Sequence, residues 1–227
     1  MDYFLINYGL VFLGIIITLV AQIFVSSSYS KYKKVKNKNG LTGFEVARKI
    51  LDENGLQNIH IVEIKGNLTD HYDPSRKVVR LSTEIFNGTS IASTSVAAHE
   101  CGHAIQDKDN YNFMRIRGKL VPIVNLSSKL GYLAVFIGII FSLFDLAIFG
   151  IILLLAMLLF ELITLPVEFD ASNRAAKQIE NLNLLEGKEK DQSKTMLRAA
   201  AFTYVAALVT TLLEILRLFL LATNRRD

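Results

Sequence analysis

Hydrophobic and polar residues are unevenly distributed along this chain of 227 residues. Three stretches are almost continuously apolar, namely residues 3–25, 130–167 and 199–222. Of the 25 basic and 21 acidic residues of the chain, these stretches hold only four. An α-helix needs about 20 apolar residues to cross about 30 Å of hydrocarbon. The pattern therefore predicts several membrane-spanning helices and a separate water-facing portion.

The first two apolar stretches predict three spans. Residues 3–25 carry no charge and are long enough for one transmembrane helix. The stretch 130–167 is too long for one ordinary span, and Asp145 marks a turn inside it. We therefore expect a helical hairpin over residues 123–166, with one helix on each side of Asp145.

A fourth span is predicted over residues 199–222. Glu214 and Arg217 lie three residues apart on this helix and can form an ion pair, which lowers the cost of burying them. The same two charges leave an amphipathic surface helix as the alternative.

The basic residues predict the orientation of the chain in the membrane. Five lysines follow the first span within residues 31–38, and 22 of the 25 Lys and Arg residues lie in the segments 26–129 and 168–198. Because Lys and Arg accumulate on the cytoplasmic side, we expect both segments in the cytoplasm and the N-terminus outside.

The water-facing part should contain a small α+β domain over residues 40–120. A capping box at 42–45 opens a predicted helix, and the alternating segments 59–64 and 77–82 predict strands. A second helix is predicted over about 91–107. The strand 77–82, as an edge strand, could align an extended peptide beside this helix.

The second helix carries the candidate chemistry in residues 99–103 (HECGH). Histidines four residues apart share one helical face, so the imidazoles of His99 and His103 can bind one zinc ion. Glu100 lies between them and can act as the general base on a water molecule. This spacing predicts a catalytic Zn²⁺ site, with two structural histidines on an amphipathic helix as the alternative.

A catalytic zinc ion needs a third protein ligand and an open fourth position. The candidate is Glu168, which follows the predicted hairpin. Because two crossings return the chain to the side it left, Glu168 and the two histidines should face the same compartment. Asp170 could orient a zinc-bound imidazole, as carboxylates often do. Alternatively, both acids belong to a solvated helix start in the segment 167–198.

Other polar residues have more than one explanation. Glu161 lies inside the apolar run and could be a backup ligand, a substrate-facing group or a side chain reaching the membrane interface. His60 and His71 are expected at the surface, and Cys101 as a packed free thiol. We assign no oxyanion stabiliser. The polar residues considered for that role, each better explained as structural, are Asn173, Arg174 and Tyr204.

Composition excludes several classes of protein. The chain is 51% hydrophobic with a mean hydropathy of +0.34, which excludes a disordered or collagen-like protein. One cysteine cannot form an internal disulfide. The pI near 9.1 could indicate a nucleic-acid partner. However, the sequence has no basic surface segment with aromatic residues between its Lys and Arg residues, and no Cys/His spacing of a zinc finger. We therefore expect no nucleic-acid binding.

Several motifs, in this order, resemble those of the bacterial YugP-type neutral zinc metallopeptidases. The matching segments are 70–74 (DHYDP), 79–82 (VRLS), 90–92 (SIA), 97–106 (AAHECGHAIQ), 165–172 (LPVEFDAS) and 203–207 (TYVAA). The resemblance extends over nearly the whole chain. It is specific because the motifs share both their residues and their order.

The resemblance implies a mainly α, multi-pass protein of the bacterial plasma membrane, with about four transmembrane helices and a zincin-like α+β domain. It implies one catalytic zinc ion, a lipid bilayer partner and protein or peptide substrates near the membrane. The chain is distantly similar to the CAAX-prenyl and heat-shock membrane endopeptidases. In those, an aspartate follows the ligand glutamate by one turn, whereas Asp170 follows Glu168 by two residues.

Two other functions fit the same motifs. One is an intramembrane protease, which the Ser- and Thr-rich residues before His99 disfavour because they cannot form a span. The other is a zinc-stabilised membrane scaffold without proteolytic activity. Glu100 discriminates against the scaffold, since a scaffold has no use for a water-activating carboxylate between two ligands.

Overall fold

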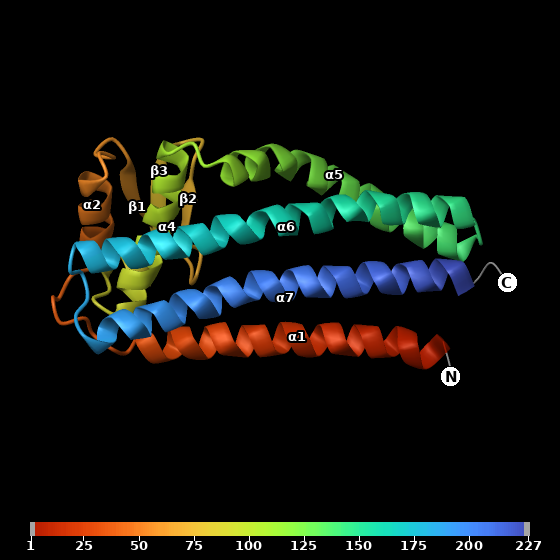
Figure 1. The fold of residues 1–227 in the computed structure, drawn as a ribbon, viewed down its shortest axis with the longest axis horizontal. Coiled ribbons are helices and arrows are strands. Elements are labelled where there is room, and N and C mark those ends of the chain that lie inside the picture. The colour runs from red at the N-terminus through yellow and green to blue at the C-terminus, as the bar shows by residue number, and fades with distance from the viewer. Residues whose placement is uncertain (1–2, 225–227) are drawn as a thin grey trace. The chain divides into compact units, whose positions relative to one another are not determined.

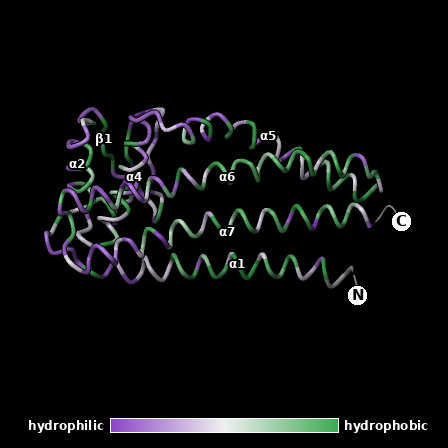
Figure 2. The backbone as a smooth tube through the Cα atoms, in the orientation of Figure 1, coloured by the Kyte–Doolittle hydropathy of each residue, from purple (hydrophilic) through white to green (hydrophobic). Residues whose placement is uncertain are grey.

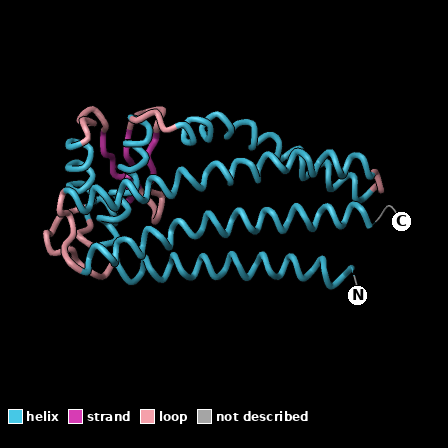
Figure 3. Tube along the Cα trace, viewed as in Figure 1, coloured by secondary structure: helices cyan, strands magenta, loops and turns pink. Residues whose placement is uncertain are grey.

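The computed structural model describes residues 3–224 and consists mainly of helices with one small sheet (Figure 1). The helices are α1 (Tyr3–Tyr32), α2 (Gly43–Glu53), α3 (Thr83–Asn87), α4 (Ile91–Lys108), α5 (Asn112–Ile140), α6 (Phe144–Asn181) and α7 (Lys188–Asn224). The strands, magenta in Figure 3, are β1 (His60–Ile64), β2 (His71–Asp73) and β3 (Val78–Ser82). The predicted fold class, mainly α with a small α+β portion, is confirmed.

Four of the described helices, α1, α5, α6 and α7, are long and apolar enough to cross a membrane. Figure 2 shows the hydrophobic colour following these helices, while hydrophilic colour predominates around the sheet. The turn between α5 and α6 lies at residues 141–143. Helix α6 then continues past residue 166, the expected end of the hairpin, because Ala171, Ala175 and Ile179 bury one face of its extension.

The chain forms two compact units. Among the described residues, the first consists of 3–22, 115–166 and 203–224. Here α5 and α6 approach closely at Gly150, where an added Cβ would lie 2.6 Å from the carbonyl oxygen of Gly131. The predicted ion pair is present, with Arg217 Nη2 2.5 Å from Glu214 Oε1. This pairing offsets part of the cost of two charges on an apolar helix.

The second unit comprises residues 23–114 and 167–202 and contains the sheet. The strand order is β1-β3-β2, with β1 parallel and β2 antiparallel to β3. The predicted strand 77–82 corresponds to β3, which is central. The expectation that it is an edge strand is therefore wrong. The cause is β2, a strand of three residues that pairs with β3 along the side expected to be open.

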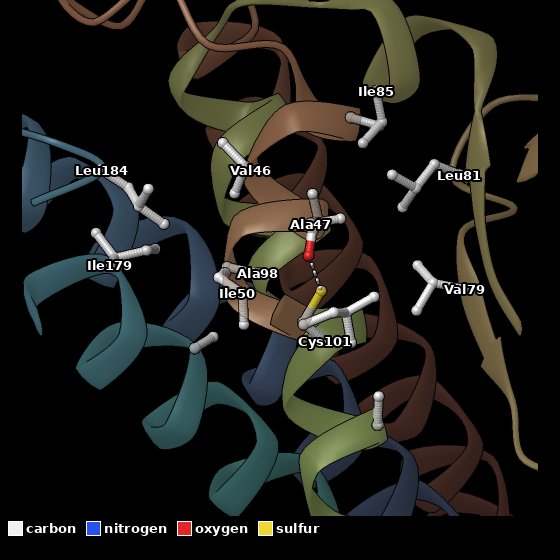
Figure 4. Packing of buried hydrophobic residues seen from close by; sticks show 14 of the residues in the cluster. Val46, Ala47, Ile50, Val79, Leu81, Ile85, Ala98, Cys101, Ile179 and Leu184 are labelled. Atoms are coloured by element: carbon white, nitrogen blue, oxygen red, sulfur yellow. Dashed lines mark hydrogen bonds between the residues drawn. The ribbon is translucent and has the colours of Figure 1, made fainter. Parts of the chain in front are cut away.

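Helix α4 is held in the hydrophobic core of the second unit. Val79 and Leu81 of β3 and Val46 and Ile50 of α2 belong to the same buried cluster as the helix (Figure 4). At its N-terminus, the Ser90 hydroxyl accepts a hydrogen bond from the backbone N–H of residue 93 at 3.0 Å. Helix α4 is thus a rigid element on which a site can be built.

Candidate metal centre

The two histidines of the HECGH segment lie together on α4. Their ring centroids are 4.8 Å apart with the ring planes almost perpendicular. Both imidazoles are largely withdrawn from solvent, and His103 is buried. Spacing by four residues places them one helical turn apart, as expected from the sequence. The helix therefore brings two candidate nitrogen ligands close together.

Glu168 of α6 completes the group. Its Oε2 lies 3.3 Å from His99 Nε2 and 3.5 Å from His103 Nε2. In a zinc tetrahedron with bonds of about 2.0–2.1 Å, neighbouring ligand atoms are about 3.3 Å apart. The three side chains, whose ligand atoms all lie within 4.8 Å of one another, thus fit a zinc ion. Among the described residues this is the group of His, Cys, Asp and Glu side chains that can hold a metal.

Close packing of two helices brings Glu168 to this position. At Gly102, between the two histidines, an added Cβ would lie 2.5 Å from the carbonyl oxygen of Ala171 on α6. Only glycine allows the α6 backbone to come this near to α4. Ala171 follows Glu168 by three residues, so the contact fixes the part of α6 that carries the candidate third ligand.

The second nitrogen of each imidazole has its own polar contact. His99 Nδ1 lies 3.2 Å from Ser172 Oγ, and His103 Nδ1 lies 3.0 Å from Gln106 Oε1. In both rings the Nδ1 contact leaves Nε2 facing Glu168. Outer partners of this kind orient metal ligands and raise their basicity.

Asp170 is connected to this arrangement through other side chains. Its Oδ2 accepts hydrogen bonds from Gln106 Nε2 at 2.9 Å and from Arg174 Nε at 2.6 Å. Arg174, considered above for the oxyanion, also contacts Asp109 at 2.5 Å. Asp170 therefore reaches His103 through Gln106, and its role toward a zinc-bound imidazole stays a prediction.

Electrostatics favour a positive ion at the centre. Burial disfavours a charge on His103, but the carboxylates of Glu168 and Glu100 outweigh this effect and raise the pKa of its imidazole above the usual range. The site thus attracts a positive charge, which a metal ion can supply in place of a proton.

Glu100, the predicted base, is buried on the same helix. Its Oε2 accepts a hydrogen bond from the backbone N–H of Tyr72 in β2 at 3.0 Å. Tyr72 pairs with Val79 of β3, and its N–H points away from that neighbour toward α4. The outer edge of β2 therefore faces the HECGH helix.

The remaining candidates lie elsewhere. His60 and His71 are exposed, and Glu161 Oε1 accepts a hydrogen bond from Thr211 at 2.9 Å within the first unit. Cys101 is fully buried, its thiol contacts the carbonyl oxygen of Ala47 at 3.6 Å (Figure 4), and burial raises its pKa. The prediction of a packed free thiol is confirmed.

Sequence reasoning missed three contributors, Gln106, Ser172 and the β2 edge at Tyr72. Gln106 follows His103 by three residues, a spacing at which helical side chains meet, so a signal was present. Ser172 and Tyr72 come from distant elements. Their contacts depend on packing that no local pattern encodes.

Comparisons with known proteins agree with the resemblance. A profile of the family described as "Putative neutral zinc metallopeptidase" matches residues 7–223. The chain is 44% identical over 207 residues to the "Putative membrane protease YugP" of Bacillus subtilis (strain 168), covering 91% of this chain and 92% of that protein. No solved structure matches the chain significantly. The chain therefore belongs to the family of neutral zinc metallopeptidases that this profile describes.

Proposed function

We propose that the protein is a membrane-bound zinc metalloendopeptidase that hydrolyses peptide bonds of protein substrates. The main support is the grouping of His99, His103 and Glu168. Glu168 Oε2 lies 3.3 Å and 3.5 Å from the Nε2 atoms of His99 and His103, close to the spacing of neighbouring ligand atoms around a tetrahedral zinc ion. Three protein ligands leave a fourth position open, as in catalytic rather than structural zinc sites. One zinc ion per chain is proposed.

Each residue then has a defined part in hydrolysis. A zinc ion held by the three ligands would polarise the scissile carbonyl and lower the pKa of a water molecule toward about 7. Glu100 accepts the proton of the attacking water and passes it to the departing amine. The Tyr72 N–H bond orients the Glu100 carboxylate before the substrate arrives. We assign no group to stabilise the oxyanion.

The substrate would align along β2. Its side away from β3 lies next to the helix that carries the proposed ligands; the Tyr72 N–H on this side is bound to Glu100, so a substrate would pair with the other backbone groups of the strand. An extended peptide can add to such an edge as a further strand. This assignment replaces the strand 77–82 proposed from the sequence.

The site is proposed to face the cytoplasm, with the N-terminus outside. The support is the sequence argument from the 22 basic residues in 26–129 and 168–198. Substrates would then be proteins near the cytoplasmic membrane surface. A reporter fused after Asp227 should be detected outside the cell, and a cytoplasmic signal would contradict four spans with this orientation.

The competing functions receive less support. Helix α4, which carries both histidines, is not among the four described helices long and apolar enough to span a membrane, which argues against an intramembrane protease. A zinc-stabilised scaffold would not need Glu100. Full biological activity of a Glu100→Gln protein would favour the scaffold.

The test compares Glu100→Gln with the parent in detergent and zinc, using casein and the chain itself as substrates. We expect at least a 100-fold loss of cleavage, because general acid–base catalysis contributes about 10²–10⁴-fold, with zinc retained. Glu63→Gln, at an exposed glutamate outside the site, is the control and should cleave like the parent. Equal cleavage by Glu100→Gln and the parent would exclude Glu100 as the base.

A further inference from the structure

Gln106 is a fully buried polar side chain between α4 and α6. Its Oε1 lies 3.0 Å from His103 Nδ1. Its Nε2 donates to the backbone carbonyl oxygen of Val167 at 2.8 Å and to Asp170 Oδ2 at 2.9 Å. The Gln106 amide thus contacts His103, a proposed zinc ligand, and two residues of α6 that flank Glu168 in the sequence, Val167 and Asp170.

These contacts determine which way the amide faces. Both partners on the Val167 side are acceptors, a carbonyl oxygen and a carboxylate oxygen, so only the NH₂ group can face them. The amide oxygen must then face His103. An oxygen only accepts hydrogen bonds, so Nδ1 of His103 must carry a proton. The lone pair of the neutral ring is then on Nε2, the atom that faces Glu168.

A second chain of contacts holds the amide in place. Asp170 also accepts a hydrogen bond from Arg174, whose guanidinium contacts Asp109 beyond the end of α4. Ser172, the partner of the other histidine, is different because a hydroxyl can donate or accept. The Ser172 contact therefore does not select a tautomer of His99. Gln106 combines tautomer selection with a link between the two ligand-bearing helices.

We propose that Gln106 is a positioning residue of the zinc site. It holds His103 with Nε2 available to the metal, and it ties α6 to α4 beside Glu168. This inference rests on the proposed zinc peptidase function. It predicts that loss of the amide weakens zinc binding even where the ligands and Glu100 are intact.

The experiment measures zinc affinity of the full chain in detergent by competition with a chromophoric chelator. Gln106→Ala should raise the zinc Kd by about 10–100-fold, the range for outer partners of metal ligands. Gln178→Ala is the control, since Gln178 is a glutamine of α6 that contacts Asn54 and none of the proposed ligands, and it should leave the Kd unchanged. Melting of the zinc-free proteins by far-UV circular dichroism reports whether each variant folds.

A variant of similar volume separates positioning from general packing. Gln106→Met fills nearly the same space but makes none of the hydrogen bonds to His103, Val167 and Asp170. Its zinc Kd should therefore rise as in Gln106→Ala, although the packing between α4 and α6 is kept.

The outcomes distinguish failure of the proposed peptidase function from failure of the role proposed for Gln106. A parent protein that binds no zinc would contradict the proposed function, and the inference with it. Zinc binding by the parent with an unchanged Kd in Gln106→Ala would overturn the inference alone. A parental Kd in Gln106→Met would also overturn it, because that variant keeps the packing of the side chain but none of its hydrogen bonds.

Discussion

Gly102→Ala should disrupt the proposed zinc site while improving the local helix propensity. Alanine is favoured over glycine by about 1 kcal/mol in a helix interior. At this position, however, the added Cβ would lie 2.5 Å from the carbonyl oxygen, 3.1 Å from the carbonyl carbon and 3.2 Å from the Cα of Ala171. These are backbone atoms of α6, so no side-chain rotation relieves the contact.

The size of the effect follows from these distances. Ordinary contact begins near 3.4 Å, so α6 or α4 must shift by about 0.9 Å at the closest atom. Glu168 lies one helical turn from Ala171 and moves with it. Zinc sites tolerate deviations of about 0.2 Å in ligand distance. We therefore expect the zinc Kd to rise at least about tenfold, with about 1–3 kcal/mol of overpacking cost in the free energy of unfolding.

The assay is chelator competition for zinc combined with thermal melting of the zinc-free protein. Gly118→Ala is the matched control: Gly118 lies inside α5, and its added Cβ would meet nothing within 4 Å. That variant should keep the parental Kd and melt at the same or a higher temperature. If Gly102→Ala binds zinc like the parent and is stabilised like Gly118→Ala, close approach at Gly102 does not position Glu168.

Three further predictions concern the ligand, pH and the thiol. Glu168→Ala should raise the zinc Kd by more than the roughly 100-fold that loss of an outer partner can cause, whereas the exposed Glu180→Ala should not change it. Because zinc needs a neutral imidazole and the pKa of His103 is raised above 6.5, zinc affinity should fall as pH decreases through that raised pKa. The zinc-free protein should show the opposite trend: its melting temperature should fall as pH rises through the same pKa. A pH-independent zinc Kd would contradict the raised pKa of His103 on which both expectations rest. Cys101, fully buried, should react with a thiol reagent only at the rate of unfolding, and rapid labelling of the native protein would refute its placement in the core.

Local signals made the ligand helix predictable from sequence. A serine N-cap, the four-residue histidine spacing and a run of small residues each specify part of α4, and the structure has it at Ile91–Lys108 against an expected 91–107. The capping box that opens α2 is present as well, with Thr42 Oγ1 accepting from the N–H of Glu45 at 3.2 Å. These features depend on neighbours within one turn, so they can be read without knowing the fold.

Other elements depend on distant parts of the chain. Strand β2 has three residues, too few for an alternating pattern, and exists because β3 offers it a partner. Its absence from the prediction is what placed β3 wrongly at the sheet edge. The extension of α6 was detectable in principle, since Ala171, Ala175 and Ile179 repeat every four residues. Its helical character was hidden by the polar residues between them.

Both topology and packing bring Glu168, the proposed third ligand, to the two histidines. A double crossing can return Glu168 to the side of the histidines, but it leaves the distance between them undetermined. In the structure that distance is set within the second unit, by contact of Gly102 with Ala171 and by the bridge from Gln106 to Val167. Both contacts involve backbone atoms of α6 within three residues of Glu168. The carboxylate at 168 therefore supplies the proposed ligand, whereas residues 102 and 106, on the other helix, determine whether it would reach the metal.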